Sequence, residues 1–224
     1  MSRITDLHPD QQKLYWTVPK LWPNSTVFII GGGPSINDMD LNQLRELNTI
    51  ICNTGFMAFP WAKVMYFGDC KVHTWISWED GGRYAEGFDN YTGLKVSCCP
   101  DTLRDSRIHT LYRRRRGLTD EPRTVGWNCN TGASAVNLAM HLGAKKVVLI
   151  GFDLQQINGK SNFHNYNFIP DEDPISIYKK FMNFWPYVKE SAEKFGLEIV
   201  NTTLNSKLDL FPFVKLEDVL SGLS

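Results

Sequence analysis

The chain has 224 residues, 42% of them hydrophobic, so it can bury a substantial core and its length suits one large α/β domain. Its 24 Lys and Arg balance its 24 Asp and Glu, so net charge favours neither nucleic acid, a membrane surface nor a strongly acidic partner. The sequence shows no signal peptide and no apolar run long enough to span a bilayer. We therefore expect a soluble, cytoplasmic protein with no membrane span.

The five cysteines are an odd number and show no metal-ligand spacing, which agrees with a reducing compartment. Cys98 and Cys99 are neighbours, and neighbouring residues of a strand point to opposite faces of the sheet. We therefore expect both to be buried thiols.

Residues 1–25 precede the first predicted strand and are interpreted as an N-terminal arm. The β-branched and aromatic run 26–30 predicts a buried strand that ends at glycine. Asp40 is a candidate cap for the next helix, with Gln43 completing a capping box and leucines recurring at helical spacing. Further strands are predicted at residues 49–52, 64–67, 94–97 and 108–111.

Residues 112–127 are polar and basic, which predicts a loop or lid. Its arginine run, 113–116, could hold the phosphates of a donor, an anionic acceptor or a nucleic-acid strand. A solvated loop explains the run equally simply, and we favour that explanation slightly.

A helix is predicted at 132–142, ending at Gly143, and is followed by a strong strand at 146–150. The polar segment 155–174 is too long for a routine connection and is a candidate lid at an active site. After it come a helix at 175–195, interrupted near Pro186, and a strand at 197–200. The alternation predicts a single Rossmann-like α/β domain over 26–224, a mostly parallel sheet flanked by helices with a polar lid loop.

Three glycines, Gly31, Gly32 and Gly33, follow the first strand and are succeeded by Pro34 and Ser35. A turn without side chains brings its N–H groups within reach of phosphate oxygens, and Ser35 adds a hydroxyl donor. The segment lacks the last glycine of G-x-G-x-x-G and the lysine of a P-loop, which weighs against NAD binding and ATP hydrolysis. A nucleotide-binding turn and a purely structural turn remain equally compatible with the glycines.

Polar residues follow the other predicted strands. Asn53 and Asp69 follow the second and third strands, Thr131 and Gly132 open the helix at 132–142, and Asp153 follows the strand at 146–150. Open parallel sheets bind ligands at the carboxyl ends of their strands, so we expect these residues to meet the glycine turn at one edge and bind a nucleotide. Taken singly, Thr131 could instead be a helix N-cap and Asp153 could cap a turn.

His164 and Tyr166 lie in the polar segment 155–174. An imidazole can accept a proton near neutral pH and a phenol can bind a phosphate, so we interpret this pair as catalytic. His73, near Asp69, is a second candidate base.

No metal site is expected, because no Cys/His cluster has metal spacing and there is no D-x-D sequence. Asp69 and Asp153 could nevertheless bind a metal ion.

Four blocks of sequence, 27–35, 51–53, 130–134 and 143–153, resemble the bacterial lipooligosaccharide sialyltransferases. The chain is also similar to the broader group of 6-hydroxymethylpterin pyrophosphokinase-like proteins, which includes flagellin-glycosylation factors and many phage proteins.

The sialyltransferase resemblance implies a metal-independent, inverting transfer of a sugar from a cytidine monophosphate (CMP) donor, with no cofactor required. Ser35, Asn53 and Thr131 match donor-binding positions of that family. His164 and Tyr166 fall in the loop that supplies the base and the phosphate-binding tyrosines.

At two positions the chain departs from the family pattern. Gly32 stands where the family has a loop asparagine, and Gly68 with Asp69 stands where it has an asparagine after the third strand.

The leading hypothesis is a nucleotide-sugar-dependent, glycosyltransferase-like enzyme that uses a CMP-type donor. The alternatives are a Mg²⁺-dependent pyrophosphokinase-like transferase and a non-catalytic protein that binds or sequesters a nucleotide. The acceptor is left open among a saccharide, a protein and a modified DNA base. Aromatic residues expected on the surface of the helix after Pro174 would support a homo-oligomer.

Overall fold

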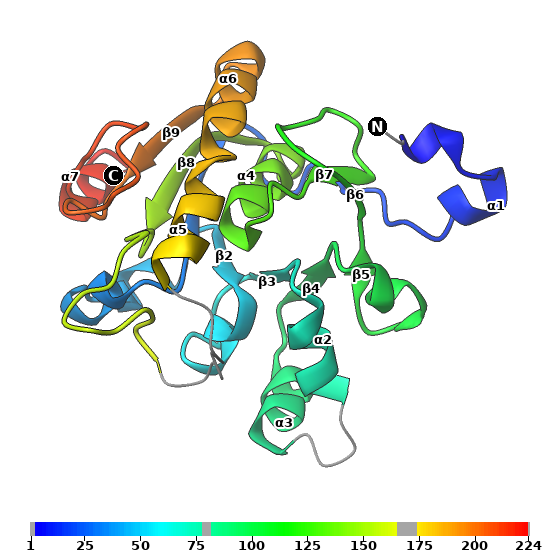
Figure 1. Ribbon diagram of the computed structural model, residues 1–224, viewed down its shortest axis with the longest axis horizontal. Helices are drawn as coiled ribbons and strands as arrows, with labels where there is room; N and C mark the ends of the chain where they lie inside the picture. Colours follow the sequence, from blue (N-terminus) through cyan, green and yellow to red (C-terminus); the bar gives the residue numbers. More distant parts are fainter. Residues whose placement is uncertain (1–2, 78–81, 165–173, 224) are drawn as a thin grey trace.

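One seven-stranded, all-parallel sheet forms the centre of the molecule, so the predicted Rossmann-like α/β class is confirmed (Figure 1). The computed structural model describes residues 3–77, 82–164 and 174–223. The strand order is β5-β4-β3-β2-β1-β8-β9. The strands are β1 (Ser25–Ile30), β2 (Thr49–Cys52), β3 (Val64–Phe67), β4 (Leu94–Ser97), β5 (His109–Thr110), β8 (Ala144–Ile150) and β9 (Glu198–Asn201).

The order of the strands reverses next to β1. The chain adds β2 to β5 on one side of β1 and then returns to add β8 and β9 on the other side. Ile30, the last residue of β1, pairs with Ile51 of β2 and with Ile150 of β8. The carboxyl ends of these three strands therefore lie level with one another, at the point where parallel sheets open a crevice for ligands.

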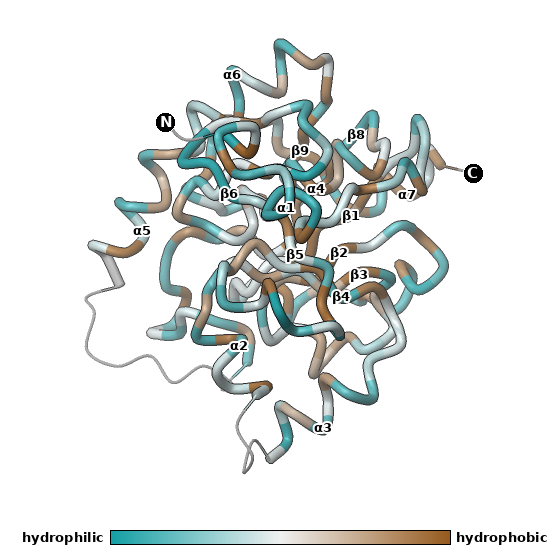
Figure 2. The backbone as a smooth tube through the Cα atoms, turned by 90° about the vertical axis from the view of Figure 1, so that its right-hand side faces the viewer, coloured by the Kyte–Doolittle hydropathy of each residue, from teal (hydrophilic) through white to brown (hydrophobic). Residues whose placement is uncertain are grey.

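Alternate residues of each strand pack into separate cores on the two faces of the sheet. Val27 and Ile29 of β1 face helices α4 (Thr131–Leu142) and α6 (Trp185–Phe195). Phe28 and Ile30 face the opposite layer. That layer consists of η2 (Pro34–Asp38), η3 (Leu41–Leu44), η4 (Asn53–Met57), α2 (Cys70–Ser77), α3 (Gly82–Asn90) and α7 (Leu216–Ser221). Figure 2 shows this pattern as hydrophobic strands inside a more hydrophilic outer chain.

The N-terminal arm lies at the β5 end of the sheet, opposite α7 (Figure 1). It carries η1 (Ile4–Asp6) and α1 (Pro9–Gln12). The Trp16 N–H donates to the Thr110 carbonyl at 2.8 Å, and the Trp16 ring stacks on His109. The arm therefore covers the outer edge of β5, the last strand on that side.

Residues 112–127 do not form the polar loop expected from the sequence. They contain β6 (Tyr112–Arg114) and β7 (Thr124–Gly126), which pair in parallel as a small second sheet. The Asn137 side chain of α4 accepts the N–H groups of Thr119 and Gly126, each at 3.0 Å. The buried Asn137 amide thus provides hydrogen-bond acceptors for backbone N–H groups of the segment 112–127, which allows the segment to be buried in the core.

The helix expected after Asp40 is a short 3₁₀ segment, η3. Asp40 caps it by accepting the Asn42 N–H at 3.0 Å. The expected capping box is absent, because the Gln43 side chain donates to the Asp40 carbonyl instead of accepting its N–H. β2 begins at Thr49, too few residues later for a regular amphipathic helix.

The helix expected over 175–195 is divided into α5 (Pro174–Met182) and α6. Pro186 lies in the first turn of α6, where its missing N–H costs no hydrogen bond. Trp185 is fully buried, so it cannot belong to the exposed aromatic surface expected after Pro174. A homo-oligomer stays a prediction.

Cys99 is not a free thiol. It forms a disulfide with Cys70, which joins the start of α2 to η5 (Pro100–Arg104), whereas Cys98 is a buried free thiol as expected. Among the described residues, no helix has the length and apolar character needed to cross a membrane.

Candidate functional site at the carboxyl edge of the sheet

The glycine turn after β1 packs directly against the turn after β8. The Gly31 N–H donates to the Ile150 carbonyl at 2.8 Å, and the Gly33 N–H donates to the Gly151 carbonyl at 2.9 Å. A Cβ atom on Gly31 would lie 2.7 Å from the Gly151 carbonyl oxygen. The close approach of two backbones therefore requires glycine here, with or without a ligand.

The carboxylate of Asp153 fills the space beside Gly33. A Cβ atom on Gly33 would lie 1.7 Å from Asp153 Oδ2. That oxygen accepts hydrogen bonds from Ser35 Oγ at 2.9 Å and from the Ser35 N–H at 3.4 Å. Asp153 is 2% exposed, and its burial raises the pKa of the carboxyl although the Ser35 bonds oppose that shift. The turn thus already holds an acidic group, which would repel a phosphate placed there.

Phe152 connects the glycine turn to the start of α4. A Cβ atom on Gly132 would lie 2.3 Å from the Phe152 ring, and one on Gly31 would lie 3.2 Å from it. Gly31 and Gly132, which the sequence analysis assigned to one site, therefore contact the same aromatic side chain.

The start of α4 meets the end of β3. Asn130 caps the helix by accepting the Ala133 N–H at 2.9 Å, so Thr131 is not the N-cap. Thr131 Oγ1 instead accepts the Gly68 N–H at 3.4 Å. The N–H groups of Thr131 and Gly132 make no hydrogen bond to the described residues. They are two of the donors that a helix start leaves open to a ligand.

Asn53 directly follows β2 and has a left-handed backbone, φ 54°. Its Oδ1 atom is buried and has no hydrogen-bond partner among the described residues. Leu154 after β8, with φ 48°, and Asn128 and Cys129 before α4 share this uncommon conformation. Such backbone strain clusters where ligands bind, and these residues all adjoin the carboxyl edge of the sheet.

The loop that carries His164 docks onto the glycine turn. The Phe163 N–H donates to the Gly32 carbonyl at 3.0 Å, and the His164 ring packs edge-on against Phe163. Burial lowers the pKa of His164 to about 4, and the positive charge of Arg83 contributes to the shift. The imidazole is therefore neutral near pH 7. Tyr166 lies outside the described residues.

The side chains of Asp69 and His73 form their contacts with other residues than those of this cluster. Asp69 is exposed and accepts the Lys71 N–H at 3.0 Å at the start of α2. His73 Nε2 lies 3.4 Å from Asp105 Oδ2 rather than beside Asp69. Asp105 is bonded mainly to Arg107, and these hydrogen bonds lower the pKa of the Asp105 carboxyl to about 2.

Among the described residues, one group of three side chains is close enough to hold a metal ion, namely Cys70, Cys99 and Asp101. The two cysteines form the disulfide and are not available as thiolate ligands.

Arg113 of β6 packs over an aromatic ring. Its guanidinium lies 5.6 Å from the centre of the Trp127 ring. That ring covers Gly68, where a Cβ atom would lie 2.0 Å from it, and Gly68 is bonded to Thr131. Arg116, by contrast, stacks on Tyr187 at 4.4 Å. The arginine run therefore divides, with Arg113 packed on Trp127 and Arg116 packed on Tyr187 of α6.

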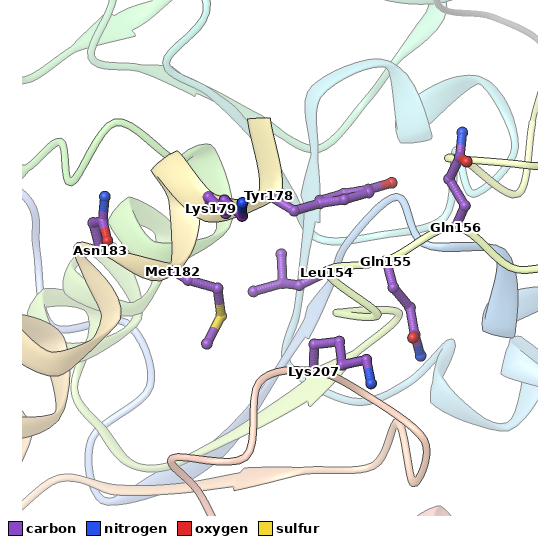
Figure 3. A pocket seen from close by; sticks show the side chains of 8 residues that line it. All are labelled: Leu154, Gln155, Gln156, Tyr178, Lys179, Met182, Asn183 and Lys207. Atoms are coloured by element: carbon purple, nitrogen blue, oxygen red, sulfur yellow. The ribbon is translucent and has the colours of Figure 1, made fainter. Parts of the chain in front are cut away.

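A cavity of about 590 Å³ opens beyond Asp153, and sequence reasoning did not predict it. Figure 3 shows Tyr178 and Met182 reaching from α5 toward Leu154, with Lys207 across the cavity. The missed signal is the spacing of four residues between Tyr178 and Met182 and between Lys179 and Asn183, the residue after α5, which places both pairs on the same side of the chain.

No protein-family model and no curated protein sequence matches the chain. The fold resembles that of the sialyltransferase CstII from Campylobacter jejuni. The CstII complex with the substrate analogue CMP-3FNeuAc gives a TM-score of 0.50 at 12% identity, covering 84% of this chain and 85% of that chain. The CstII complex with cytidine-5'-monophosphate gives 0.49 at 16% identity, covering 86% of each chain. At these identities the likeness establishes a shared fold.

Proposed function

We propose that the chain is a glycosyltransferase-like enzyme that transfers a sugar, without a metal ion, from a CMP-type nucleotide sugar to an acceptor hydroxyl. The observation that carries the proposal is the cluster of unsatisfied polar groups at the carboxyl edge. The buried Oδ1 of Asn53 and the free N–H groups of Thr131 and Gly132 adjoin the switch point of the sheet. The likeness to CstII, which binds CMP, supports the choice of donor.

The donor phosphate belongs at the start of α4 rather than in the glycine turn. The turn holds the Asp153 carboxylate, which disfavours a second anion. The start of α4 offers open N–H donors and the positive end of a helix dipole. Asn53 Oδ1 would then accept a hydrogen bond from a ribose hydroxyl or from the amino group of cytosine.

His164 is the proposed base. It accepts the proton of the acceptor hydroxyl as that oxygen bonds to the anomeric carbon, while CMP departs with the electrons of the cleaved bond. A neutral imidazole has the protonation state that this step needs. Tyr166 is proposed to donate a hydrogen bond to the departing phosphate.

The Mg²⁺-dependent alternative is less favoured, because it needs carboxylates that are free to bind the metal. Asp153 is buried and its Oδ2 is bonded to Ser35, which leaves only Oδ1 open, and Asp69 caps α2 from an exposed position. A non-catalytic nucleotide-binding protein would share the donor site and would differ only in lacking turnover.

Isothermal titration with CMP, UDP, GDP and ATP, each with and without Mg²⁺, tests the donor site. We expect CMP to bind without Mg²⁺, and Asn53→Gly to weaken CMP binding about three- to tenfold through loss of one hydrogen bond. Glycine keeps the left-handed backbone. Asn24→Gly is the matched control, because Asn24 has φ 55° at the opposite end of β1. Binding of ATP alone, and only with Mg²⁺, would contradict the proposal.

Release of CMP from CMP-sialic acid tests catalysis. We expect His164→Ala to slow release at least about 100-fold while CMP still binds, because general-base catalysis contributes roughly that much. His8→Ala, on the exposed N-terminal arm, is the control. Equal rates for the two variants would exclude His164 as the base.

A further inference from the structure

The cavity begins at Leu154, the residue after Asp153, and no described residue from the start of α4 lines it. Its walls come from the loop after β8, from α5 and from the loop after β9 (Figure 3). The Lys207 N–H donates to the Asp153 carbonyl at 2.9 Å, which ties one wall to the candidate site. The strained backbone of Leu154 turns the chain between Asp153 and the cavity. The cavity therefore adjoins the donor site without overlapping the start of α4.

The lining of the cavity suits a molecule rich in hydroxyl groups. Three side-chain amides, from Gln155, Gln156 and Asn183, contribute both donors and acceptors. Gln155 and Gln156 each use their NH₂ group in a bond to the protein, to the Asn205 carbonyl and to Ser161 Oγ, which leaves their oxygens free to accept hydroxyl protons.

Tyr178 supplies a phenol and a ring face beside the apolar side chains of Leu154 and Met182 (Figure 3). A ring face and apolar neighbours fit the C–H face of a sugar ring. The Tyr178 phenol donates to the Ser161 carbonyl at 3.5 Å, so its oxygen can accept a hydrogen bond from a ligand hydroxyl. The volume of about 590 Å³ lies within the roughly 300–1,000 Å³ typical of small-molecule sites.

The cavity also carries positive charge. Lys179 and Lys207 line it from opposite walls, and none of the described residues that line it is acidic. Neither lysine lies within ion-pair distance of a carboxylate among the described residues. Two unpaired ammonium groups facing the same space favour an anionic ligand.

We infer that this cavity binds the acceptor and that the acceptor is an anionic saccharide, an inference that rests on the donor site proposed above. The amides and Tyr178 recognise its hydroxyl groups, and the two lysines recognise its carboxylate or phosphate. A saccharide bound here would present a hydroxyl toward Asp153 and the adjacent donor site.

The test compares two sugars that differ in one carboxylate, methyl β-D-glucuronide and methyl β-D-glucoside, by saturation-transfer NMR on the full chain. We expect the glucuronide to bind at least about tenfold more tightly, as one charge-assisted contact would provide. The double variant Lys179→Gln/Lys207→Gln should lose that advantage and bind the two sugars equally. Lys180→Gln is the matched control, because Lys180 is exposed on α5 but does not line the cavity.

A second variant tests, without changing any charge, whether the sugars bind in this cavity. Asn183→Trp fills the cavity from an exposed position and should abolish binding of both sugars without unfolding the chain. Equal binding of the two sugars by the unmodified protein, or binding that survives Asn183→Trp, would overturn the inference. Hexanoate binding as tightly as the glucuronide would also overturn it, because a saccharide would then not be required.

Failure of the donor proposal gives a different result. If CMP does not bind but the glucuronide binds in a lysine-dependent manner, the cavity stands as an anionic-saccharide site and the transferase function fails. If CMP binds and neither sugar does, the donor site stands and the acceptor inference fails.

Discussion

Replacing Gly33 by alanine tests whether the glycine turn is built around the Asp153 carboxylate. Gly33 has φ −69° and ψ 152°, a conformation that any residue adopts, so the change introduces no backbone strain. The added methyl group would lie 1.7 Å from Asp153 Oδ2 and 2.6 Å from the Gly151 carbonyl oxygen. The carboxylate must therefore move away from Ser35, and the two turns must separate.

The expected loss of stability has two parts. Displacing Asp153 removes a hydrogen bond to a charged group, worth about 1.5–3 kcal/mol, and crowding a packed site costs about 1–3 kcal/mol. Alanine restricts the unfolded chain more than glycine and returns about 0.4–1 kcal/mol. We therefore expect Gly33→Ala to lower the free energy of unfolding by about 2–5 kcal/mol, which lowers Tm by about 5–15 °C in a chain of this size.

Gly32→Ala is the control, since its methyl group would meet only the end of the Asn162 side chain, at 3.1 Å. Urea and thermal unfolding followed by circular dichroism should place this variant within about 1 kcal/mol of the unmodified protein. In an Asp153→Ala background, Gly33→Ala should cost at least about 1 kcal/mol less, because the carboxylate is gone. Equal stability of Gly32→Ala and Gly33→Ala would refute the claim that the glycine turn is built around the Asp153 carboxylate.

Three further predictions concern the disulfide, His164 and Gly132. Reduction of the disulfide by dithiothreitol should lower the free energy of unfolding by about 3–4 kcal/mol, the loss of chain entropy expected for cysteines 29 residues apart. In urea titrations, dithiothreitol should no longer change the stability of the Cys70→Ser variant. His164 titrates at about 4 when folded and near 6.5 when unfolded, so the unfolded chain takes up its proton first and stability should fall as pH drops from 6.5 to 4. NMR titration of the ring protons should give that midpoint, and His164→Gln should weaken the pH dependence of unfolding; a midpoint near 6.5 would contradict its burial. Gly132→Ala should destabilise the fold by about 1–3 kcal/mol in thermal unfolding, because its methyl group would lie 2.3 Å from the Phe152 ring.

The sheet was predictable because its strands carry a strong local signal. The runs that became β1 and β8 are continuous and apolar because both faces of the sheet are covered, and the glycines after them mark their ends. The convergence of Thr131, Gly132 and Asp153 near the glycine turn followed from topology alone, since parallel strands align their carboxyl ends.

The interior of residues 112–127 was not predictable from its own composition. Its arginines and polar residues indicate a loop, but the partner that orders it is the Asn137 amide, which α4 supplies from later in the chain. Nothing in the local sequence specifies that contact. The disulfide was missed for the same reason, because Cys70 and Cys99 are brought together only when α2 and η5 pack side by side.

The glycine turn shows how one local signal can serve two purposes. Three glycines permit a phosphate to approach the backbone, but they equally permit a neighbouring strand to approach, and local sequence cannot separate the two. Asp153, 118 residues from Ser35, decides between them by placing its carboxylate in the turn. In the function proposed above, the nucleotide phosphate therefore takes its donors from the start of α4 instead of from the glycine turn. Asp153 contacts the glycine turn through Ser35 and the cavity wall through Lys207, so it connects the turn at the proposed donor edge with the cavity proposed for the acceptor.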